Sequence, residues 1–539
     1  MSHCTGTTGT SVADWPASRA HQVTVQGTAV QLHAVRKHLL DQLAGHGCRI
    51  EPAAHPGPTA PVWLRLPGGG RAVLTLGSWS ATLPADARTA AVTLTVTDPG
   101  ADPPQEWGAL LRVLDRIPLT GWEVARVVEQ MPVTRRQAEH LGPEAFAGLS
   151  LLLAIHHMRD FTGMVEALVA CGADPTRMTI IDKGYPYRSR DRVDGWLRHR
   201  LGATLVAYPD RADGIAAHLD RARAVGTPTL VFDDGGYVLP TVFDRFPDRV
   251  REIIGVVEQT MSGIWKLAPW PDLPVPVFSV AESRLKAAVE APYVVGSAVR
   301  SVTGLLPEET WAGRPALVLG YGRLGHHAAA LLRAQQRMRV AVYDTDPAAL
   351  VAAHQDGFTV DTDLTALIDR HRPLLVLGCA GRGSLRVEHL TRFPTSAYLA
   401  SMTSRDYEFP LTELAAHAER VLDYGQLGHG YLLPDGVELC VLGDGLPINF
   451  HHRESVPNRV IDLVFAALLL GGATLARPDH GGHGPGRDPE LVDRILGSSP
   501  ALGAYLNLYA DDTAPRRLLT PPAADAAEYR RSPWIYGAR

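Results

Sequence analysis

The chain has 539 residues, 45% of them hydrophobic and 20% charged, so it is globular and long enough for more than one domain. A formal net charge of -5 argues against a nucleic-acid or anionic-membrane partner and leaves a small molecule as the expected ligand. The five cysteines lack paired metal-ligand spacing, and the N-terminus lacks a basic region followed by an apolar run, which favours a cytoplasmic protein.

The first 108 residues are expected to form a small accessory α+β domain. Apolar patterns predict an amphipathic helix and four strands, at 29–47 and at 21–26, 62–66, 71–83 and 90–96. The stretch DPGADPPQ, residues 98–105, is typical of a linker. No catalytic constellation is visible in this segment.

From about residue 109 onward, helices alternate with short apolar strands, such as 178–182, 203–208 and 229–234, which predicts parallel α/β sheets. The apolar run 460–476 is short for a membrane span and carries Asp462 near its start, so we expect a buried core helix and no membrane partner. The two histidines of the Gly/Pro-rich stretch 476–489 could bind a metal, but a flexible surface loop explains them better, and no metal site is predicted.

Residues 315–344 predict a dinucleotide-binding unit, because a short strand, a glycine-rich turn, a helix and a second strand follow one another. Gly320, Gly322 and Gly325 have the Gly-x-Gly-x-x-Gly order, which permits a tight turn, close approach of a pyrophosphate, and close packing of helix on strand. Asp344 follows Gly325 by 19 residues, where its carboxylate can bind the adenosine ribose and would repel a 2′-phosphate. The predicted cofactor is therefore NAD.

Lysine is scarce in this chain, with four residues at positions 37, 183, 266 and 286 against 48 arginines. In such a background, a retained lysine can mark a site that needs an amine able to lose its proton. Lys286 is of interest for this reason, with a solvated helix lysine as the alternative.

Several separated segments, spread over residues 120–475, resemble the S-adenosylhomocysteine hydrolase family. Their motifs are EQMPVTRRQ (129–137), LAIHHMRDFTGMVEALVACGAD (153–174), FDDGGYVLP (232–240), VEQTMSGIWKL (257–267), SVAESRLKAAVEA (279–291), GYGRLG and GDGLPIN (443–449). The resemblance implies an α/β fold in which a Rossmann-type NAD-binding domain is inserted in an α/β substrate-binding domain. The expected domains are 1–108 (accessory), 109–292 (substrate-binding), 293–450 (NAD-binding) and 451–539 (return to the substrate domain and tail).

The resemblance implies an unusual use of NAD, in which a nucleoside is transiently oxidised at C3′ so that the C4′ hydrogen becomes acidic and the 5′ substituent leaves. Lys286 matches the lysine that helps deprotonate the 3′-hydroxyl, and Glu290 stands one helical turn later, where the family has Asp. Asp234 matches the catalytic carboxylate and His157 the histidine before Met. Taken singly, each has a structural alternative: a core histidine, a helix lysine, or an Asp-Gly turn.

For NAD, the resemblance adds Thr260 and Ser262, where the family's threonine run meets the cofactor, and Asn449 at the nicotinamide end. It also implies a homo-oligomer. The family's C-terminal tail, whose lysine and tyrosine reach a neighbouring protomer's NAD, is not recognisable in RRSPWIYGAR.

Several positions depart from the family around the expected substrate. The chain has Gln259 in place of Glu and Ala291 in place of Asn, so two polar partners are lost. Ser404 replaces a histidine, and Arg159 replaces a small polar residue after His-Met. His451 and His452 are alternative matches for the gating histidine. The substrate end of the pocket is therefore expected to differ from that of the family.

Three functions follow as hypotheses. The first is an NAD-dependent lyase or dehydratase of nucleosides, in which elimination is kept and water addition is lost, so that a 4′,5′-unsaturated nucleoside is released in specialised nucleoside metabolism. The second is ordinary hydrolysis of S-adenosylhomocysteine with compensating substitutions. The third is a catalytically silent protein that keeps NAD as a ligand and uses residues 1–108 to bind a partner.

Overall fold

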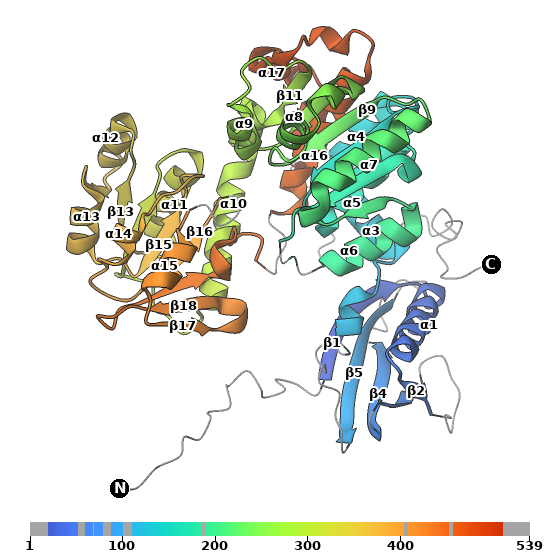
Figure 1. The fold of residues 1–539 in the computed structure, drawn as a ribbon, viewed down its shortest axis with the longest axis horizontal. Helices are drawn as coiled ribbons and strands as arrows, with labels where there is room; N and C mark the ends of the chain where they lie inside the picture. The colour runs from blue at the N-terminus through green and yellow to red at the C-terminus, as the bar shows by residue number, and fades with distance from the viewer. Residues whose placement is uncertain are drawn as a thin grey trace. The chain divides into compact units, whose positions relative to one another are not determined.

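The computed structural model describes residues 20–51, 60–67, 69–78, 88–100, 110, 112–185, 187, 189–403, 408–451 and 456–509. The described chain divides into two compact units, one made of segments within Met1–Val127 and Asp191–Gly202 and one of Val128–Arg190 and Ala203–Asp512. Each unit combines helices with a sheet or sheets, so the predicted α/β class is confirmed (Figure 1). The four domain boundaries stay a prediction.

The first unit contains an antiparallel sheet of order β1-β5-β4-β3-β2 and the helix α1. Its elements are β1 Ala20–Gly27, α1 Ala29–Gly45, β2 Arg49–Ile50, β3 Val62–Arg65, β4 Gly69–Ser78 and β5 Arg88–Gly100, close to the predicted ones. Thr28 and Gln31 form a capping box that begins α1, and Leu39 and Leu43 of this helix are fully buried in the core of the unit. The predicted linker is wrong at its start, because 98–100 continue β5, while 101–105 lie outside the described residues.

The remaining elements of this unit are the 3-10 helix Arg112–Arg116, the π-helical turn Leu197–Leu201, the start of α3 Gly121–Glu129, and α6 Arg190–Trp196. A buried ion pair links the last two, since the Arg192 guanidinium donates to both carboxylate oxygens of Glu123 at 3.1 and 2.7 Å. Bidentate pairing of this kind explains why the segment 191–202 belongs to the first unit.

The second unit begins with a seven-stranded parallel sheet of order β20-β11-β10-β9-β6-β7-β8. Its strands are β6 Ser150–Ile155, β7 Met178–Asp182, β8 Thr204–Val206, β9 Thr229–Asp233, β10 Ile253–Glu258, β11 Pro276–Ser279 and β20 Gly486–Arg487. Its helices are α4 Pro132–Leu141, α5 Arg159–Ala170, α7 Arg211–Ala224, α8 Leu239–Arg245, α9 Met261–Leu267, α17 Pro489–Gly497 and α18 Pro500–Tyr509. The predicted strands at 178–182, 203–208 and 229–234 are confirmed as β7, β8 and β9.

Both faces of this sheet are covered, which explains the continuous apolar runs of its strands. On β9, Val231 belongs to the same core cluster as Ile215 of α7, whereas the next residue, Phe232, meets Gly472 of α16 Asn458–Ala476 on the other face. A Cβ at Gly472 would lie 2.5 Å from the Phe232 ring, so glycine permits this close packing. The Asp462 carboxylate accepts hydrogen bonds from the first amides of α4, at Val133 and Thr134.

The helix α16 is long and apolar enough to cross a membrane by composition, but 83% of its most apolar window is buried inside the protein. It is a core helix, as the sequence predicts.

The NAD-binding part of the second unit is an eight-stranded sheet of order β14-β13-β12-β15-β16-β19-β18-β17. The first six strands follow the 3-2-1-4-5-6 order of a dinucleotide-binding fold, and β17 and β18 add an antiparallel edge. Its strands are β12 Pro315–Leu319, β13 Arg339–Tyr343, β14 Thr359–Val360, β15 Leu375–Gly378, β16 Ala397–Ser401, β17 Arg420–Asp423, β18 Gly428–Leu432 and β19 Glu438–Leu442. Its helices are α11 Arg323–Ala334, α12 Pro347–Gln355, α13 Leu364–His371, α14 Val387–Leu390 and α15 Leu411–His417.

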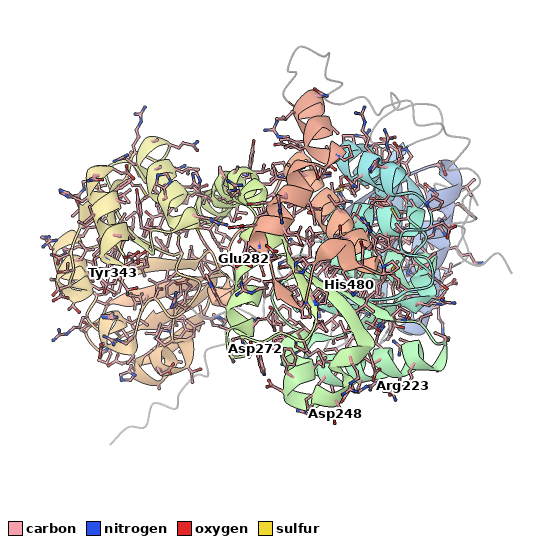
Figure 2. The ribbon with its side chains drawn as sticks, turned by 90° about the horizontal axis from the view of Figure 1, so that it is seen from above. Arg223, Asp248, Asp272, Glu282, Tyr343 and His480 are labelled. Atoms are coloured by element: carbon pink, nitrogen blue, oxygen red, sulfur yellow. The ribbon has the colours of Figure 1, made fainter. Side chains whose placement is uncertain are left out.

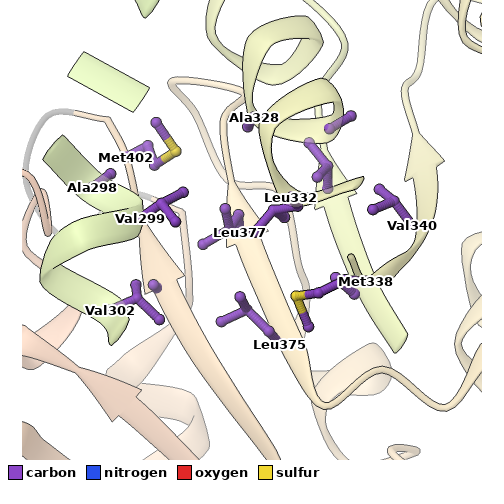
Figure 3. Close-up of a cluster of buried hydrophobic side chains, with 14 of the residues drawn as sticks. Ala298, Val299, Val302, Ala328, Leu332, Met338, Val340, Leu375, Leu377 and Met402 are labelled. Atoms are coloured by element: carbon purple, nitrogen blue, oxygen red, sulfur yellow. The ribbon is translucent and has the colours of Figure 1, made fainter. Parts of the chain in front are cut away.

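The long helix α10 Arg284–Leu305 contributes to two cores. Leu285 and Val289, in its first half, pack against a cluster that includes Leu463 of α16. Val299 and Val302, in its second half, pack with residues of α11, β13 and β15 in the core of the NAD-binding sheet (Figure 3). The candidate residues Lys286 and Glu290 therefore lie on the half of this helix that packs with α16.

Candidate active site

The glycine-rich turn between β12 and α11 has the geometry that its sequence predicts. Gly320 has a φ of 94°, which favours glycine, and Gly322 is the residue that precedes the first turn of α11. A Cβ at Gly325 would lie 1.8 Å from the carbonyl oxygen of Gly320, so only glycine lets the helix pack this closely. A Cβ at Gly322 would meet nothing within 4 Å, which leaves room above the turn.

Asp344 follows Tyr343, the last residue of β13, labelled in Figure 2. Its carboxylate accepts the backbone N–H of Tyr321, inside the glycine turn, at 2.6 Å and that of Asp346 at 2.9 Å. These two bonds fix a half-buried carboxylate beside the turn, where a ribose would lie. The glycines, the start of α11 and this acid together fit an adenine dinucleotide without a 2′-phosphate.

Thr260 and Ser262 lie at the start of α9, and their hydroxyls are 3.1 Å apart. The buried carboxylate of Glu258 holds this end of the site, because it accepts the backbone N–H groups of Gly235, Gly236 and Thr260. Burial, and the nearby Asp233 carboxylate, raise the pKa of Glu258 well above its usual range. Glu258, which sequence reasoning did not single out, thus positions the Thr260 hydroxyl and, through it, that of Ser262.

Lys286 and Glu290 form the predicted pair on α10, one turn apart, with the Lys286 ammonium against the Glu290 carboxylate. Both side chains are half-buried. Ser283 begins the helix, and its hydroxyl accepts the backbone N–H of Lys286 at 3.2 Å.

Asp234 is the centre of a buried polar cluster at the carboxyl ends of β6, β7 and β9. The Lys183 ammonium donates to Asp234 Oδ1 at 3.0 Å, and His156 Nε2 lies 3.4 Å from Oδ2. Burial opposes ionisation of Asp234, but the positive charge of Lys183 and its hydrogen bond to the carboxylate outweigh burial and lower the pKa of this carboxyl. The Lys286 charge acts in the same direction more weakly.

Aromatic side chains surround this cluster. Phe450 stacks on the His156 ring with 4.1 Å between centroids, and Tyr187 meets the same ring edge-on, its hydroxyl against His156 Nδ1. The Lys183 ammonium lies 5.7 Å from the Tyr185 ring centre and 5.5 Å from that of Tyr237. Because Phe450 follows Asn449 directly, the segment predicted to contact NAD also closes over the polar cluster.

The other predicted residues lie around this site in different ways. His157 is fully buried and stacks on Phe161 at 6.0 Å, so the histidine that contacts Asp234 is its neighbour, His156. Arg159 begins α5, two residues after His157. Gln259 is buried, and its Oε1 has no hydrogen-bond partner among the described residues. Ala291 is buried on α10.

In the final segment, the Asn449 side chain is buried, and the Ser297 hydroxyl donates to its backbone carbonyl at 3.5 Å. His451 is buried, with Nε2 2.6 Å from the carbonyl oxygen of Gln426. Ser404 and His452 lie outside the described residues.

Sequence reasoning missed His156, Lys183 and Tyr187. The scarcity of lysine was a signal that applied to Lys183 as much as to Lys286, since both are among only four lysines. The two histidines at 156 and 157 are adjacent, and only the path of the chain after β6 decides which of them faces Asp234. Within the described part of the chain, no group of three or more His, Cys, Asp or Glu side chains is placed to hold a metal ion.

Comparison with known proteins agrees with this geometry. The model of the S-adenosyl-L-homocysteine hydrolase NAD-binding domain matches residues 305–454. The chain is 28% identical to an adenosylhomocysteinase from Thermosynechococcus vestitus over 370 residues, 66% of this chain and 83% of that protein. It is 26% identical to an S-inosyl-L-homocysteine hydrolase from Methanopyrus kandleri over 364 residues, 65% of this chain and 82% of that protein.

Among solved structures, a dipicolinate synthase from Bacillus halodurans aligns with 60% of this chain and 99% of its own length, with 10% identity. Its TM-score of 0.38 is too low to support any assignment. The domain match and the geometry of the glycine turn identify NAD as the cofactor.

Proposed function

Because the chain is a divergent member of the S-adenosyl-L-homocysteine hydrolase family, we propose that it is an NAD-dependent enzyme that acts on a nucleoside by transient oxidation at C3′ and elimination across C4′–C5′. The observations that support this proposal are two lysine–carboxylate pairs, Lys286–Glu290 and the buried Lys183–Asp234, in the same unit of the chain as the glycine turn. Each lysine–carboxylate pair can accept or donate a proton, as general acid–base catalysis on a sugar requires.

In the bound state, NAD supplies reversible hydride transfer at the 3′ carbon of the sugar. Gly320, Gly322 and Gly325 would hold its pyrophosphate and Asp344 its adenosine ribose, while Thr260, Ser262 and Asn449 would face the other end. We assign to Lys286 the removal of the proton from the 3′-hydroxyl, with Glu290 oriented to receive that proton.

The Asp234 cluster is proposed to act on the opposite side of the sugar, at C4′ and C5′. Asp234 itself is an ionised partner of Lys183 at neutral pH, because its pKa is lowered, so it stabilises cationic groups rather than storing a proton. His157 is proposed to fix the position of His156, because it is the next residue in the chain and its ring is packed in the core against Phe161.

Two residues that differ from those of the family favour elimination without addition of water. Gln259 provides an amide where the family has an acid, and its buried oxygen has no partner among the described residues. Ala291 gives no polar contact at all. Since these positions offer no base to activate water, release of a 4′,5′-unsaturated nucleoside is the outcome that we propose, in a lyase or dehydratase of specialised nucleoside metabolism.

Two alternatives are open to the same test. Hydrolysis is the first alternative, because the relatives are hydrolases of S-adenosyl- and S-inosyl-homocysteine. These two substrates differ in their nucleobase, so the nucleobase of this protein's substrate need not be adenine. A catalytically silent NAD-binding protein is the second, with residues 1–108 as a partner-binding segment. Arg159, with His451, is proposed to contact the substrate, and the protein is proposed to be a cytoplasmic homo-oligomer.

Product analysis distinguishes these functions. The purified protein is incubated with S-adenosylhomocysteine, S-inosylhomocysteine and adenosine, and the products are separated and identified by mass. An unsaturated nucleoside supports the proposal, whereas adenosine or inosine plus homocysteine identifies a hydrolase. Turnover of none of these by a protein that carries bound NAD favours the silent protein, and loss of binding to a partner after deletion of residues 1–108 would then support that role.

A further inference from the structure

Four buried side chains form a continuous line of polar contacts in the substrate-binding part of the second unit. Asp234 Oδ1 accepts from Lys183 Nζ at 3.0 Å, Lys183 Nζ lies 2.9 Å from His156 Nε2, and His156 Nδ1 contacts the Tyr187 hydroxyl. The residues come from the ends of three neighbouring strands, β9, β7 and β6, and from the segment after β7. Lys183 and Tyr187 lie outside the motifs that carry the family resemblance.

The line has one direction, which the chemistry of its members fixes. A lysine ammonium can only donate, so His156 Nε2 must accept from Lys183, and the proton of the neutral imidazole resides on Nδ1. His156 Nδ1–H therefore donates to the Tyr187 oxygen, and the hydroxyl hydrogen of Tyr187 is left to point onward. Burial and the positive charge of Lys183 lower the pKa of His156 well below its usual range, which agrees with a neutral ring.

The outer end of the line is the histidine–tyrosine end. Relative exposure is 1% for Asp234 and 2% for Lys183, but 7% for His156 and 6% for Tyr187, so the last two residues keep slightly more exposed surface than the first two. Phe450 covers His156 on one face at 4.1 Å, and Tyr185 lies 5.3 Å from the same ring. The aromatic cover excludes water from the inner part of the line, as a directed proton transfer requires.

We propose that Lys183, His156 and Tyr187 form a proton relay that protonates the 5′ leaving group of the nucleoside, with Tyr187 as the catalytic acid. This inference rests on the proposed elimination. The bond between C5′ and the leaving atom breaks, and its electron pair stays on that atom. The leaving atom takes the proton of Tyr187 Oη, the tyrosine takes that of His156 Nδ1, and His156 Nε2 takes one from Lys183. Lys183 ends as a neutral amine and the leaving group as a neutral acid, so charge and protons balance.

Within this relay, His156, Lys183 and Asp234 act through Tyr187 and are positioning residues. Lys183 is suited to the innermost place because an amine can lose a proton, whereas an arginine would not. The chain keeps lysine here although 48 of its 52 basic Lys and Arg residues are arginine.

The test uses leaving groups that differ in their need for a proton. Full-length Tyr187→Phe keeps the ring and removes the hydroxyl, and it is compared on S-adenosylhomocysteine and on 5′-chloro-5′-deoxyadenosine, whose chloride leaves without protonation. We expect release of homocysteine to fall about 100-fold or more while release of chloride falls less than about 3-fold. Tyr398→Phe is the matched control, because it removes a hydroxyl that donates to Glu309 at 2.8 Å in the NAD-binding part.

Exchange of the C4′ hydrogen with deuterated water separates the relay from the proposed function. If Tyr187→Phe keeps the exchange and loses only the release of homocysteine, the relay is supported. Equal losses with both leaving groups, or no loss with either, overturn it while the proposed function stands. If the wild-type protein neither exchanges nor releases a group, the proposed function fails, and the relay fails with it.

Two further measurements do not depend on the folding of Tyr187→Phe. Lys183→Arg keeps the positive charge but withholds the proton, so it should show the same dependence on the leaving group as Tyr187→Phe. In ¹⁵N-histidine-labelled wild-type protein, with His156 assigned by the signals lost in His156→Asn, a protonated Nδ1 and an unprotonated Nε2 are expected. The opposite tautomer would overturn the relay.

Discussion

Gly322, in the turn after β12, and Gly325, in the first turn of α11, give a sharp test of the NAD site, because alanine has different consequences at each. At Gly325, a Cβ would lie 1.8 Å from the Gly320 carbonyl oxygen and 2.8 Å from its carbon, and both atoms are backbone. The helix or the turn would have to move by more than about 1 Å, which costs about 1–3 kcal/mol as overpacking in a tight core. Gly325→Ala is therefore expected to lower the stability of the protein even without cofactor.

At Gly322, a Cβ would meet no atom within 4 Å, and φ is -73°, which alanine adopts readily. Gly322→Ala is expected to change the free energy of unfolding of the NAD-free protein by less than about 1 kcal/mol, the scale of a helix-cap effect. The new methyl group would instead occupy the space that a pyrophosphate needs. NAD binding should weaken at least about tenfold, which corresponds to about 1.4 kcal/mol.

Both variants are measured by thermal unfolding and by calorimetric titration with NAD, after removal of any cofactor that copurifies. Gly322→Ala should unfold like the wild type without NAD and lose the stabilisation that added NAD gives the wild type. Gly322→Ala with wild-type affinity for NAD would refute the pyrophosphate assignment. An unchanged unfolding temperature of Gly325→Ala would refute the steric argument.

Further predictions concern the acids and lysines of the site. Asp344→Ala should remove the ribose contact and leave the purified protein without NAD, and full occupancy by mass spectrometry would contradict this. Lys286→Met should retain NAD but lose exchange of the C4′ hydrogen, and wild-type exchange in this variant would exclude Lys286 from the chemistry. Asp234→Asn should cost about 3–5 kcal/mol in chemical denaturation, because it leaves the Lys183 charge buried without its partner, and a loss below about 1 kcal/mol would contradict the ion pair. Since the pKa of Asp234 is lowered on folding, its stabilising effect is present above about pH 4 and lost on further acidification, so Asp234→Asn should also flatten the fall in stability at low pH.

The local parts of the fold follow from the sequence. The glycine turn and Asp344 are predictable because the elements involved are consecutive, and each glycine has a local steric reason. The capping box of Thr28 and the apolar helix α16 are local in the same sense. The pair Lys286–Glu290 is singled out by the family resemblance, and its helical spacing then predicts that the two side chains meet.

The polar cluster around Asp234 depends instead on sheet order. Lys183 and Asp234 are 51 residues apart, and they meet because β7 and β9 both flank β6, so that their carboxyl ends share one edge. No spacing rule in the sequence gives that neighbourhood. The choice between His156 and His157 depends on which ring turns away from the core after β6, and burial of His157 against Phe161 decides it. The continuation of β5 through the proline at 99 could not be foreseen from its linker-like composition.

The most direct test of the proposed chemistry is exchange of the C4′ hydrogen. The purified protein is confirmed to carry NAD by mass spectrometry and is then incubated with adenosine, S-adenosylhomocysteine and S-inosylhomocysteine in deuterated water. We predict deuterium at C4′ of at least one nucleoside, because transient oxidation at C3′ makes that hydrogen acidic. The absence of deuterium from every nucleoside, in a protein with NAD bound, would contradict the proposed oxidation and elimination.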